Sequence, residues 1–207
     1  MNHKINCSRI FKSGVLLGLM LTAIITGTAI AAASNQYLIT DTQAKQAYEY
    51  ALAYVKNEVA YLYGGRQSVE AYLDGLAKGK TPGEDIGVDA SGLIVNAYRH
   101  VIPNIRFYFD QSQTTTVADA TSSLLYNFNC KPITQTELQP GDLIFFKNAA
   151  GNITGVAVFS HISGDVIHFI TASVNAGKVV LTNALLSGNY WKTNFAGFGR
   201  LQYTISE

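Results

Sequence analysis

Hydrophobic residues recur with a helical period in the first half of the chain. Apolar side chains return every three or four positions over residues 41–57, where Asp41 or Thr42 can act as the N-cap, and again over residues 89–100. A shorter helix is predicted over residues 69–77. The three segments predict helices with one buried face each.

The period changes in the second half, where short runs rich in β-branched and aromatic residues are separated by Gly- and Asn-containing turns. The expected strands cover residues 143–146, 155–161, 166–173, 179–183 and 198–204. Helices followed by an antiparallel meander predict an α+β fold. No repeat or low-complexity linker interrupts this order, so we expect a single domain over residues 34–207.

The first 33 residues have the pattern of a secretory signal peptide. Lys4, Arg9 and Lys12 form a basic start without acidic residues, and an apolar run then ends in small residues near Ala33. The run is also long enough for an uncleaved membrane anchor, which is the alternative interpretation. We therefore expect export to the periplasm, the cell envelope or the medium, with no membrane span left after cleavage.

Charge and cysteine content exclude several other classes of protein. Three of the fifteen Lys and Arg residues, and none of the fourteen Asp and Glu residues, lie in residues 1–33, so the remainder is slightly acidic. It shows no basic stripe of the kind that binds nucleic acid. Only Cys130 remains in the expected mature chain, which excludes an intramolecular disulfide. No metal-spaced cluster of ligands is evident, and no cofactor is predicted.

Six short motifs occur in this order along the chain: Tyr61–Gly65, Val88–Leu93, Gln139–Phe146, Gly155–Phe159, Val166–His168 and Tyr190–Arg200. Together they resemble the NlpC family of papain-like cell-wall peptidases. That family typically shows an aromatic-Gly-Gly turn, an Asp-Cys-Ser-Gly-Leu helix start, a Pro-Gly-Asp strand, a His-Val-Gly-Ile-Tyr strand, a Phe-Ile-His strand and a closing Tyr-Trp…Gly-Ala-Arg segment. The resemblance covers about residues 44–203 and implies a papain-like arrangement of helices on a sheet.

The resemblance also shows where this chain departs from a cysteine hydrolase. The family's nucleophile is a thiolate in the first turn of a helix, whose dipole lowers the thiol pKa; a histidine takes its proton, and a third polar residue orients that histidine. Here Asp89 is a plausible cap, but Ala90 stands at the nucleophile position and Gly155 at the base position. The orienting position is assigned to His168, which is retained. Two of the three catalytic groups are therefore expected to be missing.

Other residues offer little replacement for the missing groups. Ser91 points about 100° further around the helix than Ala90. Cys130 is expected to be a buried, inert thiol, and His161 a surface histidine near a turn. Tyr61, Asp89 and Ser91 are the candidate binding residues, although Tyr61 can equally belong to the core.

We therefore expect a non-catalytic protein of this fold that binds a peptidoglycan stem peptide or an envelope protein. One alternative is a peptidoglycan endopeptidase or amidase whose cysteine has been replaced by Ala90. A single inactivating replacement would leave the base in place, and Gly155 speaks against that alternative. A second alternative is a structural envelope protein unrelated to peptidoglycan.

Overall fold

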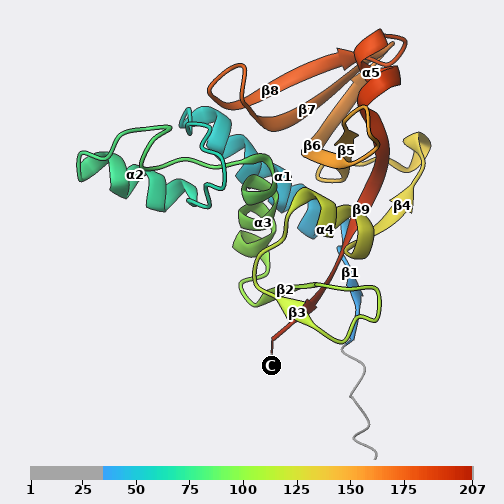
Figure 1. Ribbon diagram of the computed structural model, residues 1–207, viewed down its shortest axis with the longest axis horizontal. Helices are drawn as coiled ribbons and strands as arrows, with labels where there is room; N and C mark the ends of the chain where they lie inside the picture. Colours follow the sequence, from blue (N-terminus) through green and yellow to red (C-terminus); the bar gives the residue numbers. More distant parts are fainter. Residues whose placement is uncertain (1–34, 207) are drawn as a thin grey trace, which may run out of the picture. The chain divides into compact units, whose positions relative to one another are not determined.

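The computed structural model describes residues 35–206, and the expected signal peptide lies outside the described residues. Helices and an antiparallel sheet follow one another along this part of the chain, and the predicted α+β class is confirmed (Figure 1). No helix within residues 35–206 is long and apolar enough to cross a membrane.

The sheet is built around a consecutive meander and one long C-terminal strand. Strands β5 to β8 pair with their neighbours in sequence order, while β9 returns to pair with β5 on one side and β2 on the other, giving the order β3-β2-β9-β5-β6-β7-β8. The short strands β1 and β4 also pair with β9. The bounds are β1 Tyr37–Leu38, β2 Ile105–Tyr108, β3 Thr116–Val117, β4 Cys130–Ile133, β5 Leu143–Lys147, β6 Ile153–Ser163, β7 Val166–Ser173, β8 Lys178–Leu185 and β9 Phe195–Ile205.

The three predicted helices are confirmed to within one residue at each end, and two further short helices, α4 and α5, were not predicted. The helices are α1 Asp41–Lys56, α2 Val69–Ala77, α3 Ala90–Val101, α4 Ser122–Phe128 and α5 Asn189–Asn194, with a 3-10 turn at Gln135–Glu137. The cap of α1 is Thr40, not Asp41 or Thr42: its side chain accepts from the backbone of Gln43, whose own side chain accepts from the Thr40 N–H. This reciprocal arrangement satisfies two amide groups at the helix start.

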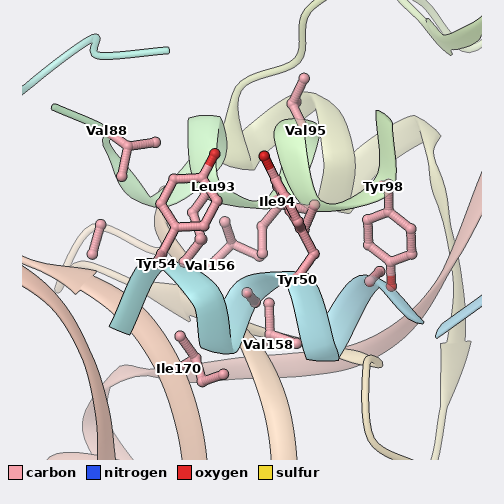
Figure 2. Packing of buried hydrophobic residues seen from close by; sticks show 14 of the residues in the cluster. Tyr50, Tyr54, Val88, Leu93, Ile94, Val95, Tyr98, Val156, Val158 and Ile170 are labelled. Atoms are coloured by element: carbon pink, nitrogen blue, oxygen red, sulfur yellow. The ribbon is translucent and has the colours of Figure 1, made fainter. Parts of the chain in front are cut away.

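The two faces of the sheet bury separate hydrophobic clusters. On one face, Val156, Val158 and Ile170 pack against α1 and α3. Figure 2 shows Tyr50 and Tyr54 reaching from α1 toward α3 in this cluster. The opposite face holds a mostly aromatic cluster. Its buried members are Ile144, Phe146, Ala157, Phe159, Ile167, Phe169, Trp191 and Phe198.

A buried ion pair joins the Pro-Gly-Asp motif to the closing segment of the chain. Asp142 is fully buried, and Arg200 on β9 donates to both of its carboxylate oxygens at 2.9 Å. Gly141 has φ +102°, and a Cβ there would lie 2.1 Å from the carbonyl oxygen of Ala44. The carbonyl of Gly141 accepts a hydrogen bond from Tyr98 on α3. These motif residues therefore hold the sheet against α1 and α3, a structural role that does not depend on catalysis.

Candidate functional site

The first turn of α3 is fixed by the carboxylate of its N-cap residue. Asp89 Oδ1 accepts from the Gly92 N–H at 2.7 Å and from the Ser91 hydroxyl at 2.8 Å. Its Oδ2 accepts from the Gly64 N–H at 3.1 Å and forms an ion pair of 2.7 Å with Arg66 Nη1. The sequence prediction of Asp89 as cap is confirmed, but both carboxylate oxygens are already engaged within the protein.

The charges beside this helix start compensate one another. Burial raises the pKa of the Asp89 carboxyl, but the hydrogen bonds from Arg66, Gly92 and Ser91 outweigh burial, so its pKa lies below the usual value. Burial lowers the pKa of Arg66, and its hydrogen bonds to Asp89 and Asp119 raise it further than burial lowers it. The helix start therefore presents a neutralised pair instead of a free negative charge.

Two glycines permit the aromatic-Gly-Gly turn to lie directly against α3. A Cβ at Gly92 would lie 2.4 Å from the carbonyl oxygen of Gly65, and a Cβ at Gly65 would lie 2.4 Å from that of Gly87. The Asp89 N–H also donates to the Gly65 carbonyl at 3.2 Å. Because a side chain at either glycine would push these segments apart, the motif glycines maintain the frame even where the nucleophile is absent.

A groove of about 760 Å³ opens beside this helix start. It is bounded by the turn at residues 61–66, the start of α3, the start of α4 and the adjoining ends of β6 and β7. Hydroxyl and aromatic groups dominate its lining, and Arg66 and Asp89 are its charged members. The lining residues are Tyr61, Tyr63, Gly64, Arg66, Asp89, Ala90, Ser91, Thr121, Ser122, Ser123, Phe146, Ile153, Thr154, Gly155, Val156, Phe169, Thr171, Ala172, Ser173, Val174, Asn175 and Tyr190.

Ala90 and Gly155 both line this groove, although they are far apart in sequence. Ala90 is the first residue of α3, where the helix dipole favours negative charge. Gly155 lies on β6 opposite Phe146, and a Cβ placed there would make only ordinary contacts, at 3.6 and 3.7 Å, with the Phe146 side chain. The described residues that line the groove include neither cysteine nor histidine.

The structure does not bring His168 to the groove, so its assignment to the orienting position needs correction. His168 pairs across the β6–β7 hairpin with His161, and their rings stack with centroids 4.2 Å apart. Thr171, three residues further along β7, lines the groove instead, and its hydroxyl donates to the Val156 carbonyl at 3.4 Å. Strand β6 continues two residues beyond the predicted strand end, to Ser163, and His168 pairs near the turn of the hairpin. The position that faces the groove therefore lies three residues further along the chain, at Thr171.

Two of the three residues of Phe169-Ile170-Thr171 are identical to the Phe-Ile-His pattern, as are two of the three residues of Val166-Ile167-His168. The position in space favours the first tripeptide, because its third residue lies in the groove. With threonine there, all three positions that the resemblance assigns to catalytic groups hold other residues.

The replacement nucleophiles weighed from the sequence are not available in this arrangement. Ser91 is 6% exposed; its hydroxyl donates to Asp89 and accepts from Arg66 Nη2 at 3.2 Å. Cys130 lies on β4, opposite Leu201 and away from the groove lining. Burial raises the pKa of the Cys130 thiol well above its usual value, which disfavours the reactive thiolate.

Aromatic side chains form the rims of the groove. Tyr61 lines it while also packing against the core, so the two interpretations of this residue from the sequence both hold in part. Burial, followed by the nearby Asp89 charge, raises the pKa of Tyr61. Tyr63 and Tyr190 are 88% and 59% exposed. Arg66 was not singled out from the sequence; its only signal was a charged residue directly after the two glycines.

No group of three or more His, Cys, Asp or Glu side chains within residues 35–206 is placed to hold a metal ion. The groove offers hydroxyls, backbone groups and aromatic faces, which suit binding of a ligand. Its lining residues include neither the thiol nor the imidazole that a cysteine hydrolase uses for nucleophilic catalysis.

Two of three comparisons with known proteins gave a match. The structure is similar to that of an NlpC/P60 family protein from Bacillus cereus ATCC 10987, with a TM-score of 0.46 and 17% identity over 79% of this chain. The match covers 41% of that protein, so this chain spans less than half of its length. Comparison with curated protein sequences gave no match. The model of the NlpC/P60 family matches residues 58–200, which is more than half of the chain and includes all six motifs, and the chain therefore belongs to the NlpC/P60 family.

Proposed function

We propose that this protein is an exported, non-catalytic member of the NlpC/P60 family that binds a cell-wall stem peptide in its groove. The observation that carries the proposal is the joint position of Ala90 and Gly155 in one groove, at the family's nucleophile and base positions. Neither a methyl group nor a hydrogen atom can attack a carbonyl or carry a proton. Export rests on the sequence pattern of residues 1–33.

The groove itself supports a retained binding role. Its volume of about 760 Å³ falls within the range of sites that hold small organic ligands or short peptide segments. The glycine contacts and the Asp89 network that shape it are intact. A peptidase with a single replaced nucleophile fits less well, because Gly155 and Thr171 stand where the other two catalytic groups are expected.

The test combines digestion and binding of purified peptidoglycan. We expect the wild-type protein to release no peptides, as separated by mass, but to sediment with insoluble peptidoglycan. Gly155→Trp should abolish sedimentation, because the first carbon of the new side chain fits beside Phe146 and the indole then fills the groove. Leu185→Trp is the matched control, since Leu185 lies on β8, is 55% exposed and is outside the groove lining.

The possible outcomes separate the three candidate functions. Peptide release by the wild type would refute the non-catalytic proposal. Equal sedimentation of Gly155→Trp and Leu185→Trp would show that the groove does not bind the cell wall. No sedimentation of the wild type would favour a structural envelope protein unrelated to peptidoglycan.

A further inference from the structure

A second cavity, of about 410 Å³, adjoins the far side of Arg66. It lies between the C-terminal end of α3, the start of β2 and the segment that follows β3. Three arginines and one aspartate are its charged members. The lining residues are Arg66, Arg99, Pro103, Asn104, Ile105, Arg106, Ala118, Asp119 and Ser206. We refer to it as the arginine cavity.

Backbone carbonyls hold two of these guanidinium groups in place. Arg106 Nη2 donates to the Thr116 carbonyl at 2.8 Å, and Arg99 Nη2 donates to the Ala118 carbonyl. Arg66 Nε completes the row with hydrogen bonds of 3.0 and 2.9 Å to the Asp119 carboxylate. The three arginines thus lie along one short piece of chain, each with its head group fixed.

The positive charge of the cavity is only partly compensated. Arg66 is paired with Asp89 and Asp119. Among residues 35–206, no carboxylate lies within ion-pair distance of Arg99 or Arg106. A guanidinium has five N–H donors, and contacts to neutral carbonyls use only part of them. As far as residues 35–206 are concerned, both half-buried arginines therefore keep donors and charge for a ligand.

We propose that the arginine cavity binds a carboxylate of the peptide that occupies the groove. Arg66 lines both the arginine cavity and the groove, so the two sites adjoin at this residue. Fixed guanidinium groups match the planar, two-oxygen geometry of a carboxylate. The groove contributes no further unpaired charge, and the arginine cavity supplies the cationic end that an acidic peptide needs. This inference rests on the proposed function, because it assigns one end of the same ligand.

A purely structural role for the arginines makes a different prediction. If Arg99 and Arg106 only hold residues 116–119 against α3, this role needs their hydrogen-bond donors but does not need a charged cavity beside them. Added anions would then bind no better here than at any exposed basic side chain. The two roles are therefore separable by titration.

The experiment is isothermal titration calorimetry of the protein with glutarate and with its neutral isostere glutaramide. We expect glutarate to bind with a Kd below about 1 mM and glutaramide not to bind. Arg106→Gln should weaken glutarate binding at least about tenfold, the loss expected for one charge-assisted hydrogen bond. Lys78→Gln is the matched control: it removes the same charge at the exposed Lys78–Asp74 pair on the α2 side and should leave binding unchanged.

Arg106→Lys guards against a variant that fails to fold, because it keeps the charge but loses the planar fork. We expect intermediate affinity for this variant at an unchanged melting temperature. Equal weakening by Arg106→Gln and Lys78→Gln would overturn the site, and so would binding of glutaramide as tight as that of glutarate. Tighter binding of inorganic phosphate than of glutarate would overturn the assignment to a peptide carboxylate.

Failure of this inference can be told apart from failure of the proposed function. Gly155→Trp fills the groove without touching the arginine cavity, so it should abolish sedimentation with peptidoglycan and leave glutarate binding intact. Loss of glutarate binding in a protein that still sediments would overturn the arginine cavity alone.

Discussion

Restoring the missing groups tests whether the groove still has the geometry of a cysteine hydrolase. The perturbation is Ala90→Cys, alone and together with Gly155→His and Thr171→His. At the first position of α3 the helix dipole stabilises an anion by about 0.3–1 kcal/mol, which raises the thiolate population at pH 7 roughly two- to fivefold. The nearby Asp89 carboxylate opposes this effect only weakly, because Arg66 neutralises it.

The imidazole contributes the larger increase in rate. Gly155 has ordinary clearance for a Cβ and no positive φ, so histidine is tolerated there without backbone strain. A positioned acid–base group is worth about 10²–10⁴-fold in rate. We therefore expect little peptidoglycan cleavage from Ala90→Cys, measurable cleavage from Ala90→Cys with Gly155→His, and more when Thr171→His supplies the orienting group. The effects should be non-additive, since the three groups act as one unit.

Two assays check this series. Peptide release from peptidoglycan, separated by mass, gives the rate, and the pH dependence of alkylation by iodoacetamide reports the thiolate. The wild type controls for Cys130, and Ala90→Cys with Leu185→His adds a histidine outside the groove. An imidazole within hydrogen-bond reach must alter the ionisation of the thiol. Identical alkylation profiles for Ala90→Cys with and without Gly155→His would therefore refute the placement of Gly155 at the base position.

Three further outcomes follow from contacts outside the catalytic positions. Asp142→Ala should lower the free energy of unfolding by about 3 kcal/mol, because it leaves Arg200 without its buried partner. Lys78→Ala, at an exposed ion pair, should lower it by less than about 0.5 kcal/mol. Urea unfolding of both variants measures the difference, and equal effects would contradict the prediction. Gly92→Ala should destabilise the fold by about 1–3 kcal/mol in the same assay, because the new Cβ would lie 2.4 Å from the carbonyl oxygen of Gly65. Alanine is the better helix former, so a gain in stability would contradict the close packing. Cys130 in the native protein should resist iodoacetamide at pH 8 and react fully in urea, since burial raises the pKa of its thiol, and rapid native labelling would show that the thiol is accessible.

Segments with a strong local signal were predicted closely from the sequence. The helix over residues 89–100 was expected from its apolar spacing and its cap, and α3 differs from it by one residue at each end. The strands of the meander were also expected, because alternation and turn residues are local features. By contrast β1 to β4, α4 and α5 were not predicted. The four strands have two to four residues each, and most of their pairing is with the distant β9.

The candidate site was predicted in part. The loss of the nucleophile at Ala90 could be inferred from the sequence because the residues on both sides of it match the family pattern, and the helix start is set by those same residues. The position of His168 outside the groove could not be inferred from the sequence, because a β-hairpin can lengthen without any change in the alternation of its strands. Phe169-Ile170-Thr171 and Val166-Ile167-His168 match the pattern equally well, and only the pairing of His161 with His168 decides which tripeptide reaches the groove.

The sequence by itself determined the α+β class, the resemblance to the NlpC family and the absence of a cysteine at the start of α3, because these depend on local periodicity and on short motifs. The tertiary structure alone decided that Thr171 lies with Ala90 and Gly155 in one groove, and that Arg66, Arg99 and Arg106 line a common cavity. The physical reason is that both sites join side chains from segments distant in the chain. Their proximity follows from strand register and from the packing of α3 beside the sheet, which no local pattern specifies.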